Sequence, residues 1–166
     1  MSKESVLKGL KKGMKGELDS ISLYKQAAEK SSGDVKDFFE ERVEEEKMHY
    51  NYLLDFYKSI DAGKSIKKIS DEFPTVEEET SPIISEKFID RISDKQHLFS
   101  AISTAVLLEL ESIKLYDKWA DQADDADLSN FYKKLADWER EHYNEVTKIE
   151  KEAEEEFWVK NRFSPF

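Results

Sequence analysis

The chain has 166 residues, of which 38% are charged and 39% hydrophobic, and its net charge is -11. This composition is that of one soluble domain with a core, and the acidic balance argues against nucleic acid or an anionic membrane as a partner. The chain has no cysteine, which excludes disulfides, thiolate metal sites and iron–sulfur clusters.

The expected location follows from the N-terminal residues and from the apolar runs. The first seventeen residues are charged throughout, and the longest apolar run covers only residues 105–108. A signal peptide needs an apolar stretch, and a membrane-spanning helix needs about 20 apolar residues. We therefore expect a cytoplasmic protein without a signal peptide and without contact with a membrane.

Helical periodicity and capping residues predict an all-α chain of one domain. Four long helices are expected over residues 3–30, 34–62, 94–122 and from 127 or 128 to 157. Gly33 and Gly63 follow the first two helices, and Asp34 is a good N-cap. The domain thus divides into a hairpin (3–62), a connection (63–93), a second hairpin (94–157) and a C-terminal tail (158–166).

Each predicted helix has an apolar stripe with alternating steps of three and four residues, which is typical of a helical bundle. Polar residues interrupt every stripe at its centre. These are Glu17 in the first helix, Glu46 and His49 in the second, Glu109 in the third, and Glu139 and His142 in the fourth. A bundle with a plain apolar core would have leucine or isoleucine at these positions.

The two hairpins repeat one another in sequence. The segment ELDSISLY at 17–24 reappears as ELESIKLY at 109–116, and EKMHYN at 46–51 reappears as EREHYN at 139–144. The offsets are 92 and 93 residues. Duplication of one hairpin explains this pattern better than chance.

The connection at 63–93 is long for a link between neighbouring antiparallel helices. It contains Pro74, Pro82 and the acidic run 77–79, and it has room for one or two short helices. It is long enough to cross the bundle, so we expect a ferritin-like four-helix bundle with its second and third helices parallel. A dimer that exchanges hairpins between chains would give the same signals.

The polar interruptions fall at matching heights. Glu17 and Glu46 lie 15 and 14 residues from the first turn, and Glu109 and Glu139 each lie 15 residues from the second. Packing the hairpins together would gather four glutamates and two histidines at mid-bundle, because each histidine lies three residues after a glutamate on the same face. Buried carboxylates must take up protons or bind cations, and two divalent ions would balance four of them.

On these motifs the chain resembles the ferritin-like di-iron carboxylate proteins, and among them the rubrerythrin-like branch, from about residue 5 to 150. The resemblance implies two iron ions, with manganese or zinc also possible. It implies that Glu46 and Glu139 bridge the metals, that Glu17 and Glu109 are terminal ligands, and that the set is completed by His49 and His142. It further implies that Tyr24 and Tyr116 donate hydrogen bonds to ligand carboxylates.

Two features depart from the rubrerythrin peroxidases. Those enzymes usually have an extra glutamate three residues after the third helix's lone glutamate, where this chain has Ser112, with Ser20 at the equivalent place in the first helix. The rubredoxin-like domain is also missing, as the lack of cysteine requires. We therefore expect a more symmetric site and a separate electron-donor protein.

The leading functional hypothesis is an enzyme, a di-iron oxidoreductase that acts on peroxide or O₂, with peroxide reduction in defence against oxidative stress as its role. The alternatives are a ferroxidase or iron-handling protein, and a non-catalytic bundle stabilised by metal. We expect a homodimer, in which the hairpins could be exchanged. Glu44 and Glu45 are expected on solvated faces, and His97 at the surface.

Overall fold

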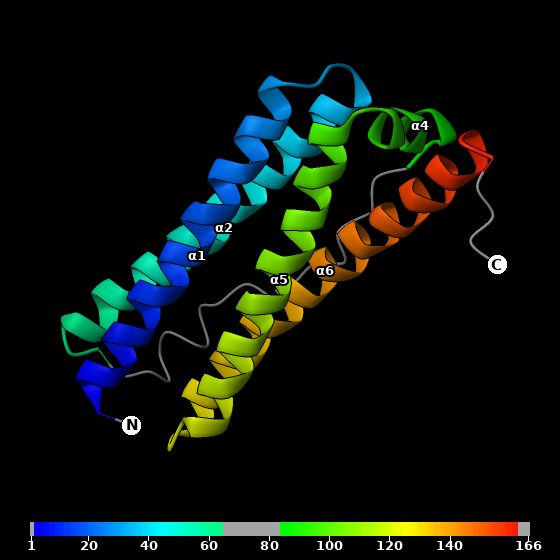
Figure 1. The fold of residues 1–166 in the computed structure, drawn as a ribbon. Helices are drawn as coiled ribbons and strands as arrows, with labels where there is room; N and C mark the ends of the chain where they lie inside the picture. The colour runs from blue at the N-terminus through cyan, green and yellow to red at the C-terminus, as the bar shows by residue number, and fades with distance from the viewer. Residues whose placement is uncertain (1, 65–83, 163–166) are drawn as a thin grey trace.

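The computed structural model describes residues 2–64 and 84–162, and the regular structure in these ranges is helical (Figure 1). It comprises the helices α1 (Lys3–Glu29), α2 (Asp34–Asp61), α4 (Glu86–Asp94), α5 (Gln96–Gln122) and α6 (Ala126–Lys160). The predicted all-α class is confirmed. None of the helices in the described ranges is long and apolar enough to cross a membrane.

The four long helices form two antiparallel hairpins whose ends are set by local capping. The Ser2 hydroxyl accepts from the Ser5 amide at the start of α1, and the Asp125 carboxylate accepts from the amides of Asp127 and Leu128 at the start of α6. Gly33 has a φ of 60° between α1 and α2, a conformation that costs glycine little. The hairpins therefore begin and end within a few residues of the predicted bounds.

Contacts at the two ends of the bundle fix its topology. His97 Nε2, at the start of α5, lies 3.3 Å from the carbonyl oxygen of Lys30, and Lys3 Nζ donates to the carbonyl oxygen of Asp61. Helix α5 therefore begins where α1 ends and runs parallel to α2, as predicted (Figure 1). The chain leaves α2 at one end of the bundle and enters α4 at the other. Pro74, Pro82 and the acidic run 77–79, which the sequence places in the connection between the hairpins, lie outside the described residues.

The second hairpin differs from the prediction at both ends. Asp94, the expected start of the third long helix, is instead the last residue of α4, and an extended Lys95 (φ -117°, ψ 101°) separates α4 from α5. Helix α6 continues past Phe157 to Lys160, whose ammonium group pairs with Asp90 and Asp94 of α4. These ion pairs attach the C-terminal turn of α6 to the short helix.

The buried core consists of two apolar clusters with a polar layer between them. One cluster lies near the α1–α2 turn and includes Phe39, Ile102 and Ile149, and the other lies near the α5–α6 turn and includes Leu10 and Leu135. Along every long helix the central glutamates fall between these two groups of residues. Apolar packing on both sides therefore holds the polar layer in place.

Candidate metal centre

The structure brings all six predicted side chains into one layer at mid-bundle. None exposes more than 5% of its surface: Glu17, Glu46, His49, Glu109, Glu139 and His142. Four long helices contribute to the layer, and all four belong to one chain. Their burial follows from the heptad positions, which point to the bundle axis.

The two Glu-x-x-His motifs meet at the centre of this layer. Ligand atoms of Glu46, His49, Glu139 and His142 all lie within 4.8 Å of one another. His142 Nδ1 is 3.0 Å from Glu46 Oε1, and His49 Nδ1 is 3.5 Å from Glu46 Oε2 and 3.4 Å from Glu139 Oε1. Both histidines therefore present the same nitrogen to the carboxylates.

The other two glutamates flank this centre, and each is held by a tyrosine from the opposite hairpin. The Tyr116 hydroxyl donates to Glu17 Oε1 at 2.6 Å, and the Tyr24 hydroxyl donates to Glu109 Oε1 at 2.7 Å. Glu17 Oε2 lies 3.7 Å from His49 Nδ1. Each tyrosine engages one carboxylate oxygen, which leaves the second oxygen for another partner.

Burial makes most of these carboxylates hard to ionise. It raises the pKa of Glu17 to about 8 and that of Glu139 to about 7. Burial, together with the charges of Glu46 and Glu139, raises the pKa of Glu109 well above its ordinary value. Without bound cations the layer therefore holds protons on several carboxyl groups near neutral pH.

The histidines and Glu46 form the ionised part of the layer. Burial opposes ionisation of Glu46, but its contacts with His142 and His49 outweigh this and keep its pKa well below the ordinary value. For both histidines burial lowers the pKa, and the surrounding carboxylates raise it by more. The imidazoles thus act as internal counter-charges in the absence of metal.

Several atoms of the layer are buried without a hydrogen-bond partner among the described residues, and these atoms test the fit of a metal. They are both oxygens of Glu46, Glu109 Oε2, Glu139 Oε1, and Nδ1 of His49 and His142. An unsatisfied buried polar group costs about 1–3 kcal/mol. Carboxylate and imidazole donors suit iron, manganese and zinc, so the residues fit divalent metal ions.

The structure corrects the expectation that Glu45 is solvated like Glu44. Its side chain is only 15% exposed, and Glu45 Oε2 lies 3.4 Å from His142 Nε2. The same oxygen lies 2.8 Å from the guanidinium of Arg42, which is itself buried. The sequence signal was Arg42 in the core stripe, since a buried guanidinium needs a carboxylate nearby.

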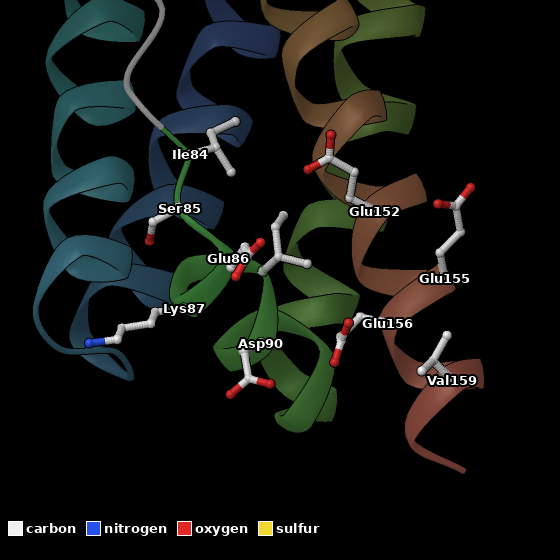
Figure 2. A pocket seen from close by; sticks show the side chains of 10 residues that line it. Ile84, Ser85, Glu86, Lys87, Asp90, Glu152, Glu155, Glu156 and Val159 are labelled. Carbon is white, nitrogen blue, oxygen red and sulfur yellow. The ribbon is translucent and has the colours of Figure 1, made fainter. Parts of the chain in front are cut away.

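A second acidic group lines an open pocket between α4 and the end of α6 (Figure 2). Its carboxylates include Glu86, Asp90 and Glu156, and Lys160 pairs with the last two of these. Water and the ammonium group stabilise these charges, so the pocket does not need a bound ion. The buried carboxylates of the central layer, in contrast, are shielded from water and have no lysine among the six side chains around them.

Comparison with known proteins points to one family. The model of the rubrerythrin family matches residues 8–150 of the chain. This range contains all six side chains of the central layer and both tyrosines. No curated protein and no solved structure gives a significant match.

Proposed function

Because the chain belongs to the rubrerythrin family, we propose that it binds two iron ions at its central layer and reduces peroxide. The observation that carries the proposal is the layer itself. Four carboxylates and two imidazoles are buried together, and six of their ligand atoms have no hydrogen-bond partner among the described residues. A bundle that needed only stability would be better served by apolar residues there.

The six side chains would divide into two equivalent sets. Glu17 with His49, and Glu109 with His142, would each hold one ion, and Glu46 and Glu139 would lie between the ions. A pair of irons would supply one electron each, and with two protons these convert H₂O₂ into two waters. The four carboxylates balance the +4 charge of two divalent ions.

The chain's own residues would orient the ligands and manage protons. Tyr116 and Tyr24 fix Glu17 and Glu109 by hydrogen bonds that cross between the hairpins. Burial raises the pKa of both phenols well above the ordinary value, so each hydroxyl stays a donor at neutral pH. The two apolar clusters restrict access of water to the layer from either end.

The electrons would come from a separate donor protein. The chain has no cysteine and therefore provides no thiolate-bound iron centre of its own to pass electrons inward. We propose a cytoplasmic homodimer that is reduced by such a donor.

The test starts from protein produced with iron supplementation. We expect about two irons per chain by elemental analysis, and consumption of one H₂O₂ for every two ferrous ions oxidised under anaerobic conditions. Glu46→Ala and Glu139→Ala should abolish binding of the pair. Glu141→Ala, on an exposed position of α6, is the matched control and should leave it intact.

Other outcomes would favour the alternatives. Oxidation of many added ferrous ions per chain with O₂, and little reaction with peroxide, would indicate a ferroxidase. Zinc as the metal bound in cells, with no redox reaction, would indicate a metal-stabilised bundle. Equal effects of Glu141→Ala and Glu139→Ala would show that the assignment of the central layer is wrong.

A further inference from the structure

The twofold repeat of the central layer is broken just outside the proposed ligands. His142 and Glu139 lie 93 residues after His49 and Glu46, and the same offset relates Trp138 to Glu45. One histidine therefore has a carboxylate behind it where the other has an indole. The inner donors are of the same kind on both sides, whereas this outer pair differs in charge and therefore distinguishes the two metal positions.

On the His142 side the outer group is a fixed anion. Glu45 Oε2 lies 3.4 Å from His142 Nε2, the ring nitrogen that points away from Glu46. Arg42 holds Glu45 through both carboxylate oxygens, at 2.8 and 2.9 Å, and also reaches Glu145 at 3.1 Å. A carboxylate held in this way cannot easily turn away from the imidazole.

On the His49 side the outer group is neutral. The Trp138 indole stacks on the His49 ring, with centroids 4.8 Å apart and an interplanar angle of 12°. Tyr52 occupies the position equivalent to Glu145, and its ring lies against the same indole with the two ring centroids 5.4 Å apart. Stacking fixes the plane of the His49 ring, but an indole cannot accept a proton from it as a carboxylate can.

A carboxylate behind a metal-binding histidine keeps the ring proton on the far nitrogen and makes the near nitrogen a stronger donor. We propose that Glu45 is a positioning residue that acts through His142 and makes the metal position at His142 the tighter of the two. The two ions then bind in order, first at His142 and then at His49. This inference rests on the proposed function, because it concerns the same site.

The chain's three histidines allow the order to be followed directly. Zn²⁺ is added to the metal-free full-length chain, and the ring resonances of each histidine are followed by NMR. At one equivalent we expect the His142 signals to shift and those of His49 to stay, with His49 following at the second equivalent. His97, exposed at the bundle end, serves as the internal reference. Simultaneous shifts, or His49 first, would overturn the inference.

Two glutamine variants separate the contact with His142 from the loss of a charge. Glu45→Gln should weaken binding of the first Zn²⁺ by about 10- to 100-fold, the usual effect of removing such a partner, and should abolish the order of shifts. Glu145→Gln removes a charge from the same Arg42 network, and it should keep both the affinity and the order. Equal effects of the two variants would show that Arg42 pairing, and not the contact with His142, is what matters.

The two proposals fail in different ways. A wild-type chain that binds neither Zn²⁺ nor iron overturns both of them, and a chain that binds iron but no Zn²⁺ overturns only the role of Glu45. A chain that binds two Zn²⁺ with no preferred order overturns only the role of Glu45. If Glu45→Gln does not fold, the order of histidine shifts in the wild-type chain decides alone.

Discussion

Two buried tyrosine hydroxyls of this chain differ in whether they have a hydrogen-bond partner. Tyr116 donates to Glu17 at 2.6 Å, whereas the Tyr132 hydroxyl is buried without a hydrogen-bond partner among the described residues. A typical hydrogen bond contributes about 0.5–1.5 kcal/mol to stability, while a buried hydroxyl without a partner costs about 1–3 kcal/mol. The same Tyr→Phe change should therefore have different consequences at these two positions.

We predict that Tyr116→Phe weakens Zn²⁺ binding by roughly 10-fold or more, because Glu17 loses the donor that orients it. Tyr132→Phe should leave Zn²⁺ binding unchanged and keep or raise the unfolding midpoint. Titration against a competing chelator measures the first effect, and thermal unfolding of the metal-free proteins measures the second. Equal Zn²⁺ affinities for the two variants would contradict the role given to Tyr116.

How far individual residues could be predicted depended on the kind of information each one needed. The six central side chains were found because helical period and distance from a turn fix both face and height. The sequence could not show that each tyrosine reaches the opposite hairpin, since that depends on how α1 packs against α5. Nor could it separate Glu45 from Glu44, which are adjacent carboxylates whose surroundings differ only after folding.

At the scale of elements, α1 and α5 approach closely along a row of glycines on α1. A Cβ atom added at Gly13 would lie 3.0 Å from the Tyr116 hydroxyl oxygen and 3.3 Å from Leu53 Cδ1. At Gly16 the nearest atom would be Ser112 Oγ at 3.6 Å, an ordinary contact. Alanine at Gly13 therefore requires Tyr116 or Leu53 to shift by a few tenths of an ångström, whereas alanine at Gly16 requires no shift.

We predict opposite effects of alanine at these two positions. Gly16→Ala should stabilise the metal-free protein by up to about 1 kcal/mol, the difference in helix propensity. Gly13→Ala gains the same propensity, but it must displace Tyr116 or Leu53, so it should destabilise the protein and weaken Zn²⁺ binding. Denaturant unfolding and the chelator titration measure the two effects. A stabilising Gly13→Ala would mean that α1 and α5 can separate freely.

The helix bounds were predictable where capping residues mark them and less so where tertiary contacts decide. Gly33 and Asp34 mark the first turn, and prediction and structure agree there. The break at Lys95 has no glycine or proline to announce it, and α4 packs against α2, α5 and α6. The extension of α6 to Lys160 likewise depends on ion pairs with α4, which lies 66–70 residues earlier in the chain.

At the scale of the whole molecule, the buried layer couples folding to protons. The folded chain holds protons on Glu17 and Glu139 up to pH values of about 8 and 7, whereas the unfolded chain loses them near pH 4.5. Stability therefore falls as the pH rises through this interval, because the unfolded state binds fewer protons. His49 and His142, with raised pKa values, act in the same direction, since their pairing with carboxylates is lost as they deprotonate.

We predict that the metal-free protein is more stable at pH 5.5 than at pH 8 when protein concentration and salt are the same. We also predict that bound Zn²⁺ reverses this order. Metal ions replace the protons, so their affinity rises with pH. At a free Zn²⁺ concentration of about 100 times the Kd, one bound ion adds ~2.7 kcal/mol to the free energy of unfolding. For a chain of this size that raises the unfolding midpoint by roughly 5–10 °C. Thermal unfolding at the two pH values, with Zn²⁺ and with chelator, measures both effects. A midpoint that rises with pH in the chelated protein would mean that the central carboxyl groups are not buried as the structure shows, since ionising them would then cost nothing.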